Sequence, residues 1–304
     1  PASLEGFKPL DFVLAPLTIF ALEEPENHLA PFYLPRLIGL LEDLIKTGSA
    51  QSFVTSHSTS VLTRIAPRNV RYFRNCRQTL VSDVKEIPLP TKGSDEDNFL
   101  HQVILANPEI YFSRLVVIGE GDSERIVIPR IAEAFGISLD PSFVAFVPIG
   151  GRHAQHLWKL VVGLNIPCIT LLDFDLGRHN AGMGRVKNAA TWLADAGYPP
   201  DPSVAIPTND ELTPETADGW TKWLRSHGVF YSTYLDLDMM MVQAFPEAYV
   251  PNRVFDETKD DPVQIAKTVF GDSGPGNVDL NRIGAPFTNE ELFIYKNLFS
   301  SKIY

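Results

Sequence analysis

The sequence predicts an α/β protein in which parallel strands are joined by helices. Short apolar runs of strand length alternate with segments whose apolar residues recur at helical spacing. The alternation restarts after a polar stretch near residue 100, and acidic residues close several of the apolar runs. With 304 residues, of which 44% are hydrophobic and 21% charged, the chain is long enough for two domains with cores of their own.

The first unit, residues 1–105, shows a strand–helix–strand order. Its expected elements are strands at Thr18–Leu22, Ser52–Ser58 and Val70–Arg74, with a helix over 32–47 between the first two. Residues 84–98 carry prolines, a glycine and a run of acids, which predicts a solvated linker. We therefore expect a domain boundary near residue 105.

The second unit, residues 106–304, restarts the alternation. Its expected strands are Leu115–Ile118, Phe143–Val147 and Cys168–Leu172, and its expected helices are Ser123–Phe135 and His153–Leu164. This order predicts a parallel sheet with right-handed crossovers. We expect a helical insertion at about 178–228, a fourth strand over Val229–Leu235, and a helical region at about 240–304.

Acidic residues follow two strands of the second unit. Glu120 closes the first strand and Glu124 lies in the helix that follows, while Asp173 and Asp175 close the third strand. Either pair alone also suits a helix start or a turn. Carboxyl ends of neighbouring parallel strands meet at one edge of a sheet, and carboxylates are the ligands that Mg²⁺ or Mn²⁺ prefers. The four acids together predict a site for one or two divalent cations, suited to phosphodiester hydrolysis.

Composition narrows the compartment and the partners. No apolar run approaches the roughly 18 residues of a membrane span, and two cysteines are too few for a disulfide framework, so we expect a cytoplasmic protein without membrane contact. The formal net charge of −11 argues against a strongly basic nucleic-acid-binding protein. Cations bound to clustered acids would offset part of that charge, so DNA stays open as a partner.

The strand-end acids resemble those of the Toprim fold, which topoisomerases, primases and certain nucleases share. Its motifs, an acid after the first strand and Asp-x-Asp after the third, occur here as Glu120 within Gly119-Glu-Gly-Asp-Ser-Glu124 and as Asp173-Phe-Asp175. The additional acid at position 124 is similar to the nuclease branch. The resemblance implies metal ligation by Glu120, Glu124, Asp173 and Asp175.

The first unit resembles the distal half of an ABC-type ATPase head. Thr18-Ile-Phe-Ala-Leu-Glu-Glu-Pro-Glu-Asn-His28 is similar to a Walker B strand, which implies that Glu23 orients Mg²⁺ and that Glu24 polarises water. The strand ending at His57 is similar to the one that senses the γ-phosphate. A solvated acidic turn is the alternative. Because no phosphate-binding loop motif occurs and the chain starts at Pro1, we expect ATP to bind only together with an upstream half of the head.

An ATPase head followed by Toprim resembles the OLD (overcoming lysogenization defect) family of nucleases, and the region after Asp236 is similar to its class 2 members. The resemblance implies metal-dependent nicking or cleavage of DNA coupled to an ATPase, a homodimer formed through the ATPase region, and a role in phage defence or DNA repair. It also implies a lysine near the metals, for which Lys302 is the first candidate and Lys296 the second, a solvated terminal lysine being the alternative. Asp236 and Asp238 are further candidates, as metal ligands, as acids that support the ligands, or as helix caps.

Three other functions fit parts of the sequence. The first is a non-catalytic Toprim-like scaffold that binds DNA, and the second is an ATP-driven structural ATPase of the chromosome-maintenance type. A primase or topoisomerase is disfavoured by the acid at position 124. Convergence of all four acids on one cation would distinguish the nuclease from the scaffold.

Overall fold

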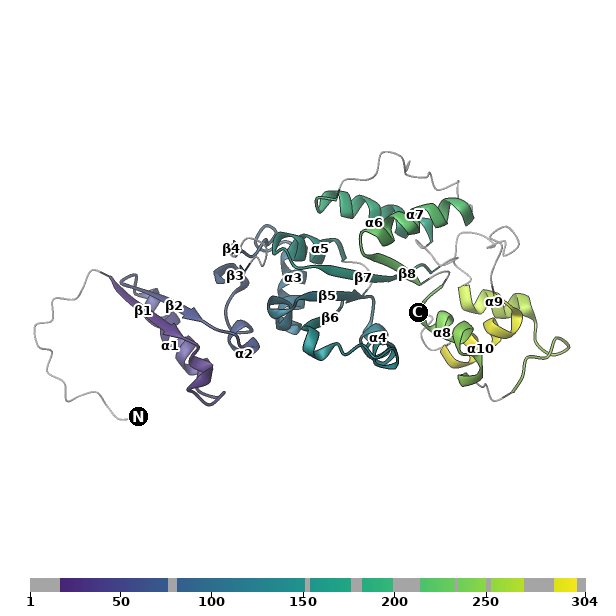
Figure 1. Ribbon diagram of the computed structural model, residues 1–304, viewed down its shortest axis with the longest axis horizontal. Coiled ribbons are helices and arrows are strands. Elements are labelled where there is room, and N and C mark those ends of the chain that lie inside the picture. The colour runs from purple at the N-terminus through teal and green to yellow at the C-terminus, as the bar shows by residue number, and fades with distance from the viewer. Residues whose placement is uncertain are drawn as a thin grey trace, which may run out of the picture.

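The chain is seen here in a computed structural model (Figure 1). The structure describes residues 17–75, 81–150, 154–175, 182–198, 214–232, 235–249, 253–270 and 287–299. Within these residues there are two sheets of two strands and one sheet of four strands.

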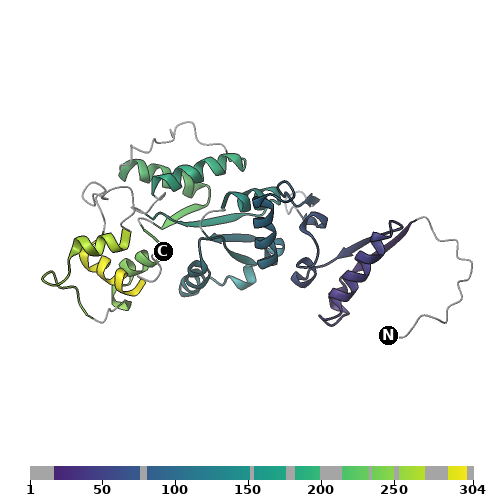
Figure 2. The same ribbon diagram turned by 180° about the vertical axis from the view of Figure 1, so that it is seen from behind.

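An N-terminal lobe is built on two parallel strands. Strands β1 (Thr18–Glu23) and β2 (Ala50–Thr55) pair in parallel, and helix α1 (Leu34–Lys46) connects them, as the sequence predicted. The buried face of α1 forms a small core with Val61 of the short helix α2 (Thr59–Leu62). Figure 2 shows this lobe standing apart from the central sheet.

The N-terminal lobe leaves apolar side chains in solvent. Ile19 of β1 is 58% exposed, Phe53 of β2 is 55% exposed and Leu40 of α1 is 63% exposed. Parallel sheets in other proteins are almost always covered on both faces. These side chains therefore mark surfaces that such a pair of strands normally buries.

Of the two expectations for residues 70–98, one is confirmed and one is wrong. The predicted third strand of the first unit is present as β3 (Arg71–Asn75), which pairs antiparallel with β4 (Ser82–Glu86) in a separate ribbon. The predicted linker is structured, because Ile87 is buried and helix α3 (Asp95–Ala106) begins within it. The acidic run at 95–97 is the first turn of α3, where the helix dipole favours negative charge, and the Ser94 side chain caps that turn.

The central sheet has the predicted parallel arrangement. Its strands are β5 (Leu115–Gly119), β6 (Val144–Pro148), β7 (Cys168–Asp173) and β8 (Val229–Ser232), in the order β6-β5-β7-β8. Its helices are α4 (Asp122–Ala134), α5 (Ala154–Gly163), α6 (Met183–Asp195) and α7 (Pro214–Ser226). Strand β5 lies inside the sheet and is almost wholly buried, which explains its continuous apolar sequence.

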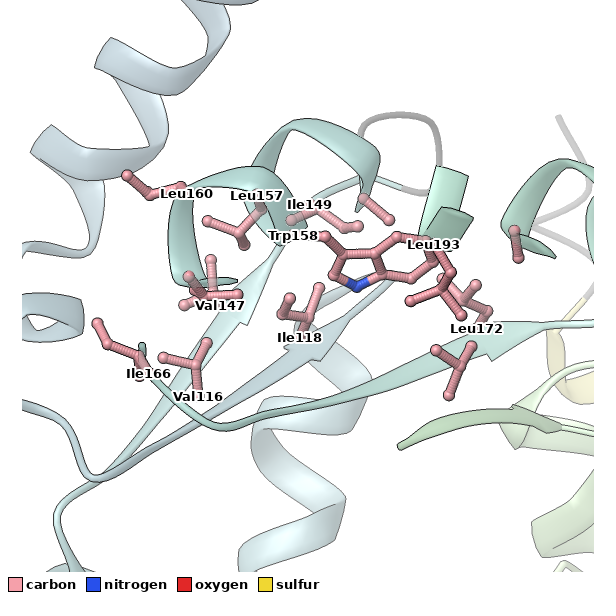
Figure 3. Close-up of a cluster of buried hydrophobic side chains, with 14 of the residues drawn as sticks. Val116, Ile118, Val147, Ile149, Leu157, Trp158, Leu160, Ile166, Leu172 and Leu193 are labelled. Carbon is pink, nitrogen blue, oxygen red and sulfur yellow. The ribbon is translucent and has the colours of Figure 1, made fainter. Parts of the chain in front are cut away.

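The main core lies between this sheet and α3, α5, α6 and α7 (Figure 3). Trp158 of α5 faces the sheet and is 1% exposed, and its Nε1 donates to Thr170 Oγ1 of β7 at 2.7 Å. Leu100, Val103 and Ile104 of α3 belong to the same core. The residues just before the expected boundary near 105 thus pack with the central sheet, and the division into 1–105 and 106–304 stays a prediction.

A second helical group follows β8. It consists of α8 (Leu237–Ala244), α9 (Pro262–Phe270) and α10 (Asn289–Phe299), and it has its own core around Leu235 and Met239. Figure 1 shows these helices gathered beyond the carboxyl ends of the central strands. Across the described residues, no helix combines the length and apolar character needed to span a membrane.

The buried bond between Trp158 and Thr170 gives a stability prediction. Thr170→Val leaves the indole N–H without its acceptor, so we expect the free energy of unfolding to fall by about 1–3 kcal/mol in urea titrations. In a Trp158→Phe background the same change should have a much smaller effect, because the donor is gone. Thr191→Val, on the exposed side of α6, is the matched control. Equal losses in both backgrounds would show that the hydrogen bond contributes nothing.

Candidate metal centre

The pairing of β5 with β7 brings the acids at their ends together. Ile118 of β5 lies opposite Thr170 of β7, so Glu120 and Asp173 follow at the same edge of the sheet. The backbone N–H of Asp173 donates to Glu120 Oε1 at 3.0 Å. The acids of the two motifs, 53 residues apart in the chain, are therefore in direct contact.

The segment after β7 fixes Asp173 and Asp175. Phe174 between them is 1% exposed and packs edge-to-face on Tyr231, with ring centroids 5.9 Å apart. Asp175 leaves the extended conformation at φ 50°, and its N–H donates to Leu235 O at 2.7 Å. Ser232 Oγ donates to Asp173 Oδ1 at 2.8 Å. The end of β8 thus supports Asp173, and Leu235, which follows that strand, supports Asp175.

An arginine that the sequence analysis missed lies among these acids. Arg185, in the first turn of α6, places Nη1 2.6 Å from Glu120 Oε1 and Nη2 2.6 Å from Asp175 Oδ2. Nη1 also donates to Asp173 O at 3.0 Å. A signal was present, because the helix dipole disfavours a cation at a helix start unless acids compensate it. We refer below to Glu120, Asp173 and Asp175 as the strand-end acids.

Burial and mutual repulsion shift the ionisation of this cluster. Burial, together with the nearby Glu120 and Asp236 carboxylates, raises the pKa of Asp173 to about 8. Burial also raises the pKa of Glu120, although the Arg185 guanidinium partly offsets the effect. Burial alone would lower the pKa of Arg185, but Glu120 and Asp175 outweigh it and raise that pKa. When all three strand-end acids are ionised, they therefore carry more negative charge than the Arg185 guanidinium neutralises.

Glu124 lies near the cluster but is engaged by its own helix. Its side chain is buried, and its Oε2 accepts the Gly121 N–H at 2.9 Å, which satisfies a backbone donor at the start of α4. A Cβ at Gly119 would come within 2.9 Å of Glu124 Cβ, so only glycine allows this close approach. The two glycines of the Gly-Glu-Gly motif are thus explained by the position of Glu124, and metal ligation by Glu124 stays a prediction.

The remaining candidates of the sequence analysis have different environments. Asp236 takes the predicted role of helix cap, since its Oδ1 accepts Met239 N at 3.0 Å, and its Oδ2 accepts Tyr295 Oη at 2.5 Å. Asp238 is half-buried in the first turn of α8. Lys296 lies on α10. The hydrogen bond from Arg253 lowers the pKa of Asp260 to about 2, and the charge of Lys296 makes a smaller contribution in the same direction. Lys302 lies outside the described residues.

The carboxylate oxygens of the strand-end acids are suitable ligands for a divalent cation, although in this structure the side chains do not surround a single point. All three offer hard carboxylate oxygens, and a positive group already lies within 2.6 Å of two of them, so Arg185 acts as a stand-in for a bound cation. Within the described residues, however, no three acid, histidine or cysteine side chains are placed so that they could hold a metal ion. Metal binding here requires Arg185 and the carboxylates to adjust.

A second polar cluster closes the two strands of the N-terminal lobe. His57 Nε2 lies 2.9 Å from Glu24 Oε1, and the Glu24 N–H donates to Thr55 O at 3.0 Å. Glu26 Oε1 accepts from Ser56 Oγ at 2.7 Å and from His57 N at 2.9 Å. Glu23 is exposed at the end of β1. The structure thus brings Glu24 and His57 together, and their contact with ATP stays a prediction.

Comparison with known protein families gives two matches. Residues 111–175 match the family model of the "Overcoming lysogenization defect protein-like, TOPRIM domain". Residues 10–63 match that of an "AAA domain, putative AbiEii toxin, Type IV TA system". The first match spans the strand-end acids, and the second spans the β1–β2 pair.

Two solved structures are also similar. The C-terminal region of the Xanthomonas campestris pv. campestris OLD protein shares 24% identity over 64% of this chain and 82% of its own, with a TM-score of 0.37. That of the Burkholderia pseudomallei OLD protein shares 21% identity over 63% of this chain and 85% of its own, with a TM-score of 0.37. No relative was found among curated proteins.

The raised pKa of Asp173 predicts how stability depends on pH in the metal-free protein. The ordinary pKa is 3.8 and the folded value is about 8, so the folded state binds the extra proton between these limits. Stability supplied by that proton is present at low pH and is lost as pH rises from about 4 to about 8. We expect the Tm of Asp173→Asn to rise relative to that of wild type across this window. The difference should be about 2–4 °C for each kcal/mol of stability that wild type loses.

Thermal unfolding in EDTA at closely spaced pH values measures this difference. Asp195→Asn, an exposed aspartate on α6, is the matched control and should track wild type at every pH. A Tm difference between wild type and Asp173→Asn that stays constant from pH 4 to pH 8 would contradict the expectation.

Proposed function

We propose that this chain, whose residues 111–175 match the OLD-like Toprim family model, is a divalent-metal-dependent endonuclease that nicks or cleaves DNA. One observation carries the proposal: acids from the ends of two adjacent parallel strands are gathered around a single positive group. Glu120, Asp173 and Asp175 would hold the Mg²⁺ or Mn²⁺. Such a cation, when bound, polarises a phosphate and lowers the pKa of water.

The protein's own groups would keep the ligands oriented. The Asp173 N–H bond to Glu120 ties the two ligand-bearing strand ends, and Ser232 fixes one oxygen of Asp173. Hydrogen bonds to ligands of this kind typically matter 10- to 100-fold for metal affinity or activity. These contacts support a site whose ligand-bearing strand ends are fixed by the sheet before a metal binds, while the carboxylate side chains and Arg185 still have to adjust.

The N-terminal lobe would couple this activity to ATP. The Glu24–His57 contact supports this proposal, because it lies at the carboxyl ends of two parallel strands, where ligands bind in open α/β sheets. ATP would bind only with further parts of that head, and the same region would form a homodimer. We also propose a cytoplasmic role in phage defence or DNA repair, as implied by the family.

A DNA-binding scaffold without cleavage is the second candidate. The observation that favours it is the arrangement of the described acids, no three of which are placed to hold a metal. The engagement of Glu124 in its own helix cap points the same way. The nuclease and the scaffold differ in one respect that is easily measured, namely whether bound DNA is cut.

Nicking of supercoiled plasmid in Mg²⁺ or Mn²⁺ tests the proposal. Glu120→Gln and Asp173→Asn should each lower the rate about 100-fold or more, since each removes a direct ligand. Glu133→Gln, an exposed acid on α4, is the matched control and should cut at the wild-type rate. DNA binding without cutting by the wild-type protein would support the scaffold, and undiminished cutting by both variants would sink the assignment.

A further inference from the structure

Arg185 contacts all three strand-end acids. Its guanidinium bridges Glu120 and Asp175, with N–O distances of 2.6 Å to each, and also donates to the Asp173 backbone. The Arg185 side chain is 28% exposed, against 14% for Glu120 and 8% for Asp175. A partly solvent-accessible cation therefore covers two more deeply buried carboxylates.

The backbone of Arg185 is fixed to the same strands. Tyr231 Oη donates to Arg185 O at 3.2 Å, and the Gly182 N–H at the start of α6 donates to Phe174 O at 2.7 Å. The first turn of α6 is thus tied to the segment that carries the two aspartates. The backbone of this turn therefore stays beside the acids even if the Arg185 side chain changes rotamer.

A cation at this position is electrostatically unusual for a helix. The positive end of the α6 dipole opposes a guanidinium in the first turn, so only the neighbouring acids favour it there. The same acids would repel one another without a positive charge between them. Arg185 and the acids therefore stabilise each other, and a divalent cation at the same oxygens would remove the need for that partnership.

We propose that Arg185 is an internal counter-cation, which holds the strand-end acids together while no metal is bound and competes with the divalent cation for them. The inference rests on the proposed function, because it concerns the same metal centre. A guanidinium close to two ligands repels an incoming divalent cation and occupies oxygen lone pairs that the cation needs. Metal binding then requires Arg185 to withdraw toward solvent, where it remains available as a positive group.

A competing role and a supporting role predict opposite results. If Arg185 competes, replacing it by a neutral residue should lower the stability of the metal-free protein and raise its affinity for the metal. If Arg185 only positions the ligands, the same replacement should lower both the stability and the metal affinity, because the acids would move apart. Metal affinity is therefore a property that distinguishes the two, and it is measurable without any cleavage assay.

The experiment is a titration of the 304-residue chain with Mn²⁺, followed by the EPR signal of free Mn²⁺, together with Tm in EDTA. The variants are Arg185→Gln, which keeps amide donors but no charge, and Arg185→Lys, which keeps the charge but not the planar bidentate fork. Glu120→Gln identifies the Mn²⁺ that belongs to this centre. Arg253→Gln, which removes an arginine paired with Asp260 on the C-terminal helical side, is the matched control.

We expect Arg185→Gln to bind the Glu120-dependent Mn²⁺ about tenfold tighter than wild type or more, and to have a lower Tm in EDTA. Arg185→Lys and Arg253→Gln should stay within about twofold of wild type in Mn²⁺ affinity. If the Gln variant is too unstable without metal, saturating Mn²⁺ should restore its Tm to the wild-type value with metal, and failure to do so counts against the proposal.

Two results overturn the inference, and they are distinguishable. Wild type binding the Glu120-dependent Mn²⁺ as tightly as Arg185→Gln, or tighter, would refute the competition while leaving the metal centre intact. Absence of Glu120-dependent Mn²⁺ in wild type and in both Arg185 variants would refute the counter-cation and the metal-dependent function together.

Discussion

The parallel pairing of β5 with β7 determines where every group of the candidate metal centre lies. It places Glu120 and Asp173 in contact. The neighbouring β8 then supplies Ser232, and Leu235 after that strand supplies the carbonyl that holds Asp175. The pairing is itself secured by the buried core on one face of the sheet, including Trp158 and its bond to Thr170. Precise placement of charge at the edge thus depends on apolar packing in the middle.

Charge balance is the second constraint, and it follows from the first. Once the sheet brings buried carboxylates together, the cluster must bind protons, an arginine or a metal ion. The structure contains the arginine, while the raised pKa of Asp173 indicates that one guanidinium leaves the balance incomplete. A centre of this kind is less stable than an apolar one would be, and it gains affinity for cations in return.

Much of this arrangement was predictable from the sequence, because apolar strands and the acids that close them are local patterns. The parallel order and the meeting of Glu120 with Asp173 followed from them. Long-range partners were not predictable in the same way. Arg185 and Tyr295 reach their acids only through tertiary packing, and the acids at 95–97 were misinterpreted because a helix start and a solvated linker share a composition.

Anomalous scattering from crystals of the full chain grown with Mn²⁺ tests the central claim most directly. The claim is that the strand-end acids form a cation site. It predicts a manganese peak bonded to carboxylate oxygens of Glu120 and at least one of Asp173 and Asp175, with the Arg185 guanidinium moved away from them. Saturating Mn²⁺ with no peak at this edge, and Arg185 still bridging Glu120 and Asp175, would contradict it.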